Sequence, residues 1–181
     1  ITGAGKGETI LSAAPRYAQV LRLNSCRNVS MTGFTAGHTV EPGSCVGGVI
    51  YLDYDRGVSI RDVGLYGCGV TGVSADNCTD LTVANSDIYE CSYNGIQVMN
   101  STGVNVVNCK LYDLGKNQEW EASEVFNLVS SSDIAISDCE IYGNLSQYLV
   151  RSSGVDQVTL KNNVFRDNWA QESAFGTFGD F

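Results

Sequence analysis

Two acidic side chains recur at equivalent positions of a short sequence repeat. Asp53 and Asp76 are one repeat apart, and Asp55 stands just beyond Asp53. Carboxylates held close together can bind a divalent cation, or can share a proton because a neighbouring negative charge raises one pKa. Two carboxyl groups about 5 to 5.5 Å apart also suit retaining glycoside hydrolysis. The spacing therefore marks Asp53 and Asp76 as candidate catalytic residues, and Asp53, Asp55 and Asp76 as candidate ligands for calcium.

Aromatic and hydrogen-bonding side chains accompany these carboxylates. Tyr51 precedes the first carboxylate by two positions, and Gln97 lies at the equivalent position two repeats further along. The segment 115–123 carries Trp120 between Glu119 and Glu121. An aromatic ring with polar groups around it is a combination that binds sugars, because the ring has an apolar face and the polar groups hydrogen-bond. We expect these five residues to contact a polysaccharide substrate.

The elements that must position these side chains are short repeats. Five alignable segments are VSIRDVGLYGC (58–68), LTVANSDIYEC (81–91), VNVVNCKLYDL (104–114), IAISDCEIYGN (134–144) and VTLKNNVFRDN (158–168). Their starting positions give a period of about 23 residues, with one insertion before the fourth segment. A unit this short cannot bury its own apolar face and must stack on its neighbours.

Each repeat holds three short strands. Apolar residues alternate in Ile50-Tyr-Leu52, in Val58-Ser-Ile60 and around Leu65, and equivalent residues follow in later repeats. Alternation with period two is typical of strands with one face inward. Three strands in so short a repeat leave no room for a crossover helix, so successive repeats pair in parallel, and such connections are right-handed in most proteins. The sequence predicts an all-β, right-handed parallel β-helix of about six to seven rungs with three parallel sheets.

Residues 1–181 are expected to form one domain. Residues 1–19 form a partial N-terminal rung, 20–168 the repeats, and 169–181 a C-terminal cap or tail. The chain begins within the repeat pattern, which predicts a fragment of a longer protein with further covalently attached domains. Two longer connections, 39–47 and 115–123, fall between third and first strands and would flank the first-sheet residues.

Equivalent residues in stacked rungs form ladders about 4.8 Å apart. Asn and Asp side chains occupy the corner between second and third strands, where they tolerate left-handed backbone; they are Asp62, Asn85, Asn108, Asp138 and Asn162. A row of outward tyrosines, Tyr66, Tyr89, Tyr112 and Tyr142, is open to two interpretations. It could be a sugar-binding platform, or its rings could stack on one another for stability.

The seven cysteines are an odd number, so at least one is unpaired within the chain. Cys68 and Cys91 occupy one inward position in adjacent rungs, as do Cys109 and Cys139. Parallel Cβ vectors give a poor disulfide torsion, which favours buried free thiols. The single histidine, His38, has no identifiable partner in the sequence.

Composition excludes some partners. A net charge of −9 and a pI near 4.4 argue against nucleic acid and anionic membranes as partners, since both need a basic face. No apolar run approaches the length of a membrane span, so no membrane insertion is expected.

The segments NCTDLTVANSDIYECSYNGIQV (77–98) and NSTGVNVVNCKLYDL (100–114) resemble the right-handed β-helix repeats of pectate lyases, polygalacturonases and bacterial surface proteins. The resemblance covers nearly the whole chain and implies the fold and an extracellular or cell-surface location. The Asn-Thr-Asp, Asp-Asp and Gly-His-Gly motifs of polygalacturonase-like proteins do not occur here. The acidic first-sheet residues match the calcium site of pectate-lyase-like enzymes in part.

Two functions remain open at this point. The first is a non-catalytic β-helix domain of a secreted or surface protein that recognises polysaccharide or serves as a structural stalk. The second is a polysaccharide lyase or glycoside hydrolase that uses the acidic first-sheet site. A competing interpretation makes Asp53 and Asp76 solvated turn residues of an acidic protein.

Overall fold

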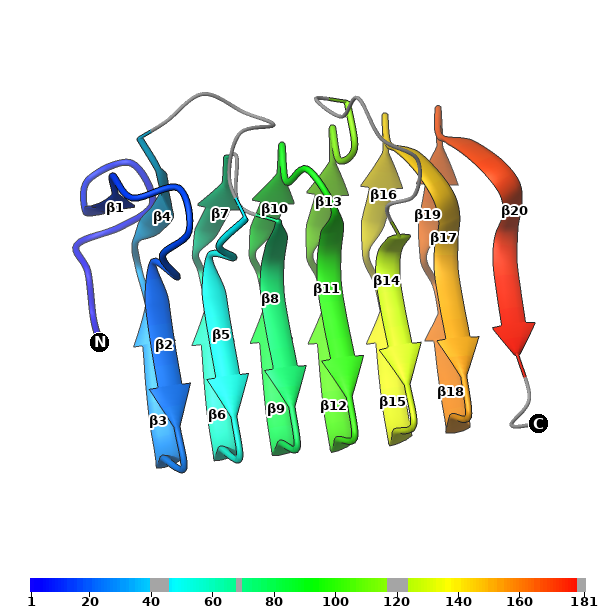
Figure 1. Ribbon diagram of the computed structural model, residues 1–181, viewed down its shortest axis with the longest axis horizontal. Helices are drawn as coiled ribbons and strands as arrows, with labels where there is room; N and C mark the ends of the chain where they lie inside the picture. The colour runs from blue at the N-terminus through cyan, green and yellow to red at the C-terminus, as the bar shows by residue number, and fades with distance from the viewer. Residues whose placement is uncertain (40–45, 68–69, 117–123, 179–181) are drawn as a thin grey trace.

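Twenty short strands and no helix make up the described part of the chain, residues 1–39, 46–67, 70–116 and 124–178 of the computed structural model. The strands follow one another in groups of three, and each group makes one rung of a coil (Figure 1). The rungs stack along the long axis of the molecule, with the N-terminus at one end and the C-terminus at the other.

Three parallel sheets run along this coil. The first sheet contains β2 (Leu21–Asn24), β5 (Ile50–Asp53), β8 (Thr71–Asp76), β11 (Asn94–Met99), β14 (Glu124–Val129), β17 (Leu145–Ser153) and β20 (Trp169–Phe178). The second sheet contains β3 (Arg27–Thr32), β6 (Arg56–Arg61), β9 (Thr79–Ala84), β12 (Thr102–Val107), β15 (Ser132–Ser137) and β18 (Asp156–Lys161). The third sheet contains β1 (Ile10–Ala13), β4 (Thr35–His38), β7 (Gly64–Tyr66), β10 (Asp87–Tyr89), β13 (Lys110–Tyr112), β16 (Glu140–Tyr142) and β19 (Val164–Arg166).

The predicted stacking register is confirmed. Leu111 pairs with Ile88 in the preceding rung and with Ile141 in the following one, as the aligned repeats require. Every strand pairs in parallel with its equivalent one rung away, which makes the fold a parallel β-helix. The two longer connections also lie where the repeats placed them, one between β4 and β5 and the other between β13 and β14.

The two ends of the chain extend the coil. Residues 169–178, expected to form a cap or tail, form β20, which pairs with β17 as a further strand of the first sheet. The pairing shifts register between Ser146 and Tyr148, and this irregularity explains why β20 does not align with the repeat pattern. At the other end, β1 pairs with β4 and forms part of the expected partial rung.

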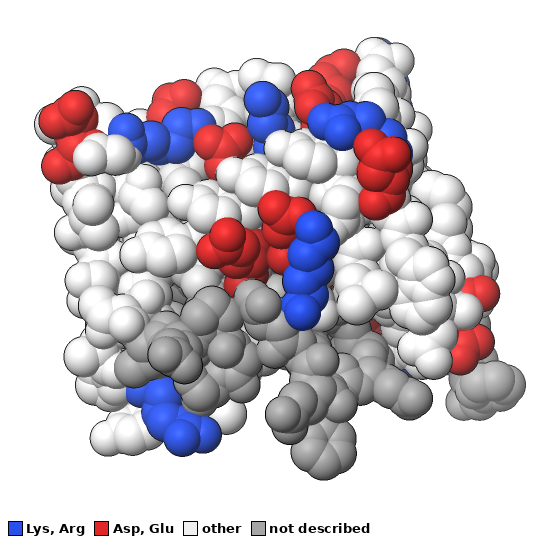
Figure 2. All heavy atoms as spheres, turned by 90° about the horizontal axis from the view of Figure 1, so that it is seen from above, with Lys and Arg blue, Asp and Glu red and all other residues white. Residues whose placement is uncertain are grey.

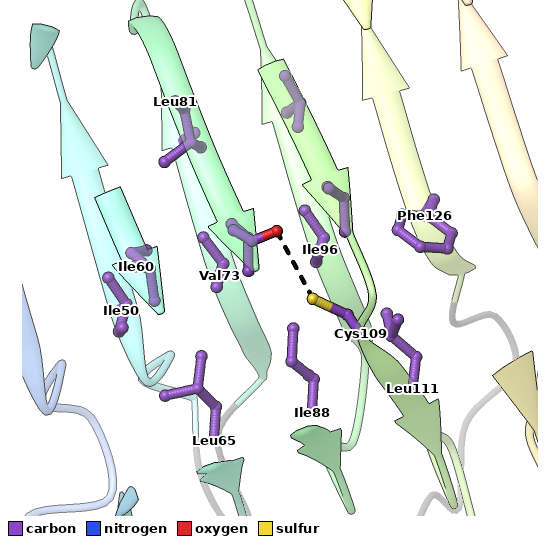
Figure 3. Packing of buried hydrophobic residues seen from close by; sticks show 14 of the residues in the cluster. Ile50, Ile60, Leu65, Val73, Leu81, Ile88, Ile96, Cys109, Leu111 and Phe126 are labelled. Carbon is purple, nitrogen blue, oxygen red and sulfur yellow. Dashed lines mark hydrogen bonds between the residues drawn. The ribbon is translucent and has the colours of Figure 1, made fainter. Parts of the chain in front are cut away.

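The interior of the coil is filled by inward rows from all three sheets. Ile50, Val73, Ile96 and Phe126 come from the first sheet, Ile60 and Leu81 from the second, and Leu65, Ile88 and Leu111 from the third (Figure 3). All of them are almost fully buried. Each row repeats at the strand spacing, so an inward apolar residue packs on its equivalents above and below as well as across the core.

Left-handed backbone forms the corners. The predicted ladder from Asp62 to Asn162 has φ between 51° and 55° at all five positions. The amide side chains also bond from rung to rung, because Asn108 Nδ2 donates to Asn85 Oδ1 over 2.9 Å. A left-handed residue turns the chain sharply, and Asn and Asp adopt this conformation more readily than other non-glycine residues.

Many corners contain a polar side chain that points inward just after the left-handed residue, whereas Val63 and Leu114 are apolar residues at this position. Ser86 accepts a hydrogen bond from the Val63 N–H in the preceding rung (3.3 Å) and donates to the Ala84 carbonyl two residues earlier (2.7 Å). At the first corner, between the first and second sheets, Ser101 accepts from the Cys78 N–H over 2.9 Å and donates to the Met99 carbonyl. At the third corner, between the third sheet and the first sheet of the next rung, Asn144 Oδ1 accepts from the Leu114 N–H. These side chains satisfy backbone groups that leave the strand ladder at the corners.

Cysteine takes the place of serine in several of these corners. Cys109 Sγ donates to the Val83 and Val107 carbonyls, and the first of these contacts is the dashed line in Figure 3. The Cys109 N–H in turn donates to Cys139 Sγ over 3.4 Å. The prediction of buried free thiols is confirmed for four residues, Cys78, Cys91, Cys109 and Cys139. Cys26 is free and half-buried, while Cys45 and Cys68 lie outside the described residues.

The in/out assignment can be tested with two adjacent residues. Leu111 is fully buried, so Leu111→Asp places an unpaired carboxylate in an apolar row and should lower the free energy of unfolding by about 3 to 5 kcal/mol. Tyr112→Ser removes an outward ring and should cost about 1 to 2 kcal/mol. Urea unfolding followed by circular dichroism measures both, and equal losses would contradict the assignment.

The thiols should be protected in the folded protein. Burial raises the pKa of Cys91 to about 12, and the Cys139 contact together with burial raises the pKa of Cys109. The reactive species is the thiolate, so at pH 8 these cysteines should react with a thiol reagent very slowly before unfolding and rapidly after it. Reagent kinetics with and without denaturant check this, and fast labelling of Cys91 in the native state would count against it.

Candidate functional site

Asp53 and Asp76 lie side by side on the outward face of the first sheet. They are register partners in β5 and β8, as their spacing predicted. Each carboxylate accepts a hydrogen bond from an asparagine on the side away from the other: Asn24 donates to Asp53 over 2.7 Å, and Asn100 donates to Asp76 over 3.0 Å. Both carboxylates are partly exposed, so they can offer oxygen ligands to a cation or a hydrogen-bonding ligand.

Asp55 belongs to a different structural feature. It is buried, and its carboxylate accepts from the Cys26 N–H over 2.7 Å and from the Asp53 N–H over 3.1 Å. It thus occupies the inward polar position of the first corner, where Ser101 stands two rungs later. The described ranges contain no group of three or more His, Cys, Asp or Glu side chains arranged to hold a metal ion. A calcium site on the pair Asp53 and Asp76 stays a prediction.

A second outward row runs along the middle of the first sheet. Strand register aligns Tyr51, Ser74, Gln97, Asn127 and Arg151, one residue per rung. Three of the five, Tyr51, Gln97 and Arg151, carry long or aromatic polar side chains, and all five can hydrogen-bond. This polar row lies two residues from the Asp53 position, and the neighbouring carboxylates contribute to the raised pKa of Tyr51 after the larger effect of its burial.

The polar row contains an unsatisfied acceptor. Asn127 is about nine-tenths buried, and its Oδ1 has no hydrogen-bond partner among the described residues. Among the described residues, its neighbour in the row, Gln97, makes a weak contact through Nε2 to the Met99 sulfur at 3.6 Å. Buried polar atoms are usually paired, so this enclosed amide oxygen is an exception in the sheet.

Glu124 and Arg151 form an ion pair at the loop end of the sheet. Glu124 Oε1 and Arg151 Nη1 are 3.5 Å apart, and the Glu124 side chain is buried while that of Arg151 is partly exposed. Burial raises the pKa of Glu124, and the Arg151 charge opposes this shift in part. A carboxyl group with a raised pKa retains its proton to higher pH, which is the property a general acid requires.

Sequence reasoning missed Asn127, Arg151 and Arg22. The guanidinium of Arg22 lies over the Tyr51 ring, 5.4 Å from its centroid, one rung before the predicted binding residues. The sequence did contain a signal for two of them. Arg151 follows Asn127 by one repeat period, so both occupy the same position of the first strand in successive repeats. Trp120, Glu119 and Glu121, the other predicted binding residues, lie outside the described residues.

The tyrosine row is not a sugar platform. Its rings stack face to face at centroid distances of 5.8, 5.1 and 5.0 Å, with interplanar angles of 16°, 3° and 5°. Arg166 covers the Tyr142 end of the stack at 4.1 Å. The ring faces that a sugar would need are therefore occupied by other rings, and the stability interpretation is confirmed.

His38 is also structural. It is buried, and its Nε2 lies 2.7 Å from the Ala18 carbonyl oxygen, to which the ring donates in the tautomer protonated there. The contact joins β4 to the connection before β2 and lies on the third sheet, away from the polar row.

Charge is unevenly spread over the loop end of the coil. Figure 2 shows acidic and basic side chains along one edge, a smaller mixed group near the centre, and uncharged atoms over much of the remaining surface.

Among the described residues, no helix has the length and apolarity needed to cross a membrane.

Comparison with known proteins gives one family and a common fold. The family model described as "Right handed beta helix region" matches residues 48–178. No curated protein sequence matches the chain.

Two solved structures share the fold at low sequence identity. The surface protein and adhesin PfbA of Streptococcus pneumoniae has a TM-score of 0.64 and 10% identity, covering 91% of this chain and 64% of that one. The A-module of the mannuronan C-5 epimerase AlgE6 of Azotobacter vinelandii has a TM-score of 0.51 and 14% identity, covering 95% and 58%. The chain thus spans less than two thirds of the length of either structure.

The acidic pair gives a testable effect on stability. In the absence of a cation, Asp53→Asn with Asp76→Asn removes the repulsion between stacked like charges and should raise the free energy of unfolding by about 0.2 to 1 kcal/mol. The asparagine oxygens can still accept from Asn24 and Asn100. Adding calcium should raise the Tm of the wild type and leave that of the double variant unchanged.

Asp138→Asn is the matched control. Asp138 is an exposed corner carboxylate that accepts from Asn162, and its ladder neighbour on the other side is Asn108, so no carboxylate adjoins it in the ladder. This variant should keep the calcium response. A wild-type Tm that does not change with calcium would remove the pair as a cation site.

Proposed function

We propose that this chain, which belongs to the right-handed β-helix family, is a non-catalytic domain that binds polysaccharide through the outward face of its first sheet. The observation that carries the proposal is the polar row, Tyr51, Ser74, Gln97, Asn127 and Arg151. It places one hydrogen-bonding side chain per rung on rigid strands, and Tyr51, Gln97 and Arg151 are partly exposed.

The chemistry of the row suits a chain of sugars. Sugar hydroxyls both donate and accept, and the row offers amides, hydroxyls and a guanidinium that match them. Asp53 and Asp76 add acceptors along one side of the row, and Arg22 and Arg151 add positive charge near its ends. A long polymer can contact several rungs at once, which compensates for the modest strength of each hydrogen bond.

The location and context follow from the same proposal. We place the domain outside the cell or on its surface, within a longer protein that supplies further domains. The shared fold with a bacterial surface adhesin supports this location, and the partial coverage of both solved structures is compatible with a larger parent protein.

A second candidate is a polysaccharide lyase or glycoside hydrolase. The observation that favours it is Glu124, whose raised pKa and adjacent Arg151 suit a general acid beside a bound anionic group. Incubation with mannuronan and other polysaccharides would show it by new unsaturated or reducing ends. Product formation that Glu124→Gln abolishes would favour the enzyme over the binding domain.

The binding proposal is tested with the double variant Gln97→Ala, Asn127→Ala. A panel of neutral and acidic polysaccharides is first titrated by calorimetry to find the ligand of the wild type. The loss of two hydrogen-bonding side chains should then weaken binding by about 5- to 150-fold, on the basis of about 0.5 to 1.5 kcal/mol per hydrogen bond. Stability should change little, because the Asn127 oxygen has no partner among the described residues.

The control is the double variant Thr82→Ala, Asn105→Ala. These residues are register partners on the outward face of the second sheet, so the change is chemically similar and lies on another side of the coil. It should leave binding intact. If no polysaccharide binds the wild type, or both double variants weaken binding equally, the first-sheet face is not the site.

A further inference from the structure

Tyr54 has an unusual backbone conformation for a residue of its size. It stands at the corner between β5 and β6, at the lower edge of Figure 1, and its φ is 55°. Bulky residues rarely adopt this left-handed conformation, because it brings Cβ close to the following carbonyl oxygen. The other rungs have smaller residues at the same corner position, namely Ser25, Asn77, Asn100, Ser130 and Gly154. The corner itself therefore does not require a tyrosine.

Hydrogen bonds to the adjacent rungs hold Tyr54 in this conformation. Its N–H donates to the Asp76 carbonyl over 3.1 Å. The next residue, Asp55, accepts from the Asp53 N–H over 3.1 Å and from the Cys26 N–H over 2.7 Å. A strained residue persists where the surrounding structure fixes it in this way, and such residues are concentrated at ligand-binding sites. The strain at Tyr54 thus points to a use for its side chain.

The Tyr54 ring is open to solvent. The residue is 63% exposed, and its two neighbours along the corner, Ser25 and Asn77, have short side chains. Within the described ranges, no other ring and no guanidinium stacks on it, whereas Arg22 lies over the ring of Tyr51. An exposed aromatic face can stack on the apolar face of a sugar ring.

Hydrogen-bond acceptors adjoin this ring. Asp53 directly precedes Tyr54, and Asp76 is the register partner of Asp53. The two carboxylates accept from the neutral amides of Asn24 and Asn100. A sugar hydroxyl can donate to such a carboxylate in a charge-assisted hydrogen bond. The carboxylate of a uronic acid would be repelled here, because like charges at short range raise the free energy of the complex. These surroundings favour a neutral sugar.

We propose, on the basis of the function proposed above, that a neutral sugar unit of the bound polysaccharide stacks on Tyr54 and donates hydroxyl hydrogen bonds to Asp53 and Asp76. Tyr54 follows Tyr51 by three residues, or about 10 Å at the rise of an extended chain. The polysaccharide therefore reaches from the polar row to the corner at this end of the first sheet. Tyr54 and the two carboxylates select the class of sugar.

Calorimetric titration of neutral polysaccharides and polyuronates tests the proposal, with EDTA present so that no cation covers the carboxylates. A neutral polysaccharide should bind the wild type, and Tyr54→Asn should weaken this binding about 3- to 10-fold, the range expected for one aromatic contact. Tyr54→Phe should retain most of the binding, because stacking uses the face of the ring. Tyr54→Asn should also raise the Tm by about 2 to 4 °C, since asparagine tolerates left-handed backbone better than tyrosine does.

Glu90→Asn is the matched control. Glu90 is another exposed left-handed residue, with a φ of 56°, and it follows β10 at a different corner. This variant should also raise the Tm, because it relieves the same kind of strain, and it should leave binding unchanged. Equal weakening of binding by Glu90→Asn and Tyr54→Asn would overturn the assignment of Tyr54.

The remaining outcomes separate this site from the function on which it rests. A neutral polysaccharide that binds the wild type and Tyr54→Asn equally overturns the stacking site, and the polar row keeps its own test through Gln97 and Asn127. Binding confined to polyuronates overturns the neutral sugar and leaves the binding domain standing. A wild type that binds no polysaccharide overturns both.

Discussion

The structure depends on satisfying the backbone N–H that follows each left-handed corner residue. At a corner the chain leaves one sheet before it enters the next, so this N–H cannot always use a strand partner. The next rung supplies a side-chain acceptor instead: Ser86 for Val63, Ser101 for Cys78 and Asn144 for Leu114. Because the acceptor must sit one rung along at the same position, the corners fix the period of the coil, and the strand register follows from them.

This constraint explains a composition that otherwise looks unusual. Serine, cysteine, asparagine and aspartate all fill the inward corner position, since each can accept from the preceding rung, and serine, cysteine and asparagine also donate to a nearby carbonyl. Several of the cysteines are therefore corner residues with a hydrogen-bonding role, beyond the small apolar role expected of buried thiols. Asp55 is buried because it fills a corner position and accepts from the Asp53 N–H, while Asp53, two residues earlier, is on the outer face.

Features that recur in every repeat could be predicted from the sequence. Features that depart from the repeat could not. Leu111 and Tyr112 could be assigned inward and outward because the same pattern recurs in adjacent rungs, and the left-handed ladder from Asp62 could be assigned because Asn and Asp recur there. β20 was missed because a register shift near Ser146 displaces it from the period. Asn127 and Arg151 were missed because residue type varies along an outward row, and only the alignment of first strands brings them together.

The three faces of the coil differ in what their outward rows can bind. Inward and corner positions are constrained by packing and hydrogen bonding, so function has to use outward rows. On the third sheet the tyrosine rings occupy one another's faces, and on the second sheet the outward row runs through short side chains such as Ser59, Thr82 and Ala135. The first sheet differs, because its outward row includes the long, partly exposed polar side chains of Tyr51, Gln97 and Arg151, and the two longer connections adjoin its strands. A ligand that needs several directed hydrogen bonds finds them on that face, and this is why the binding proposal rests there.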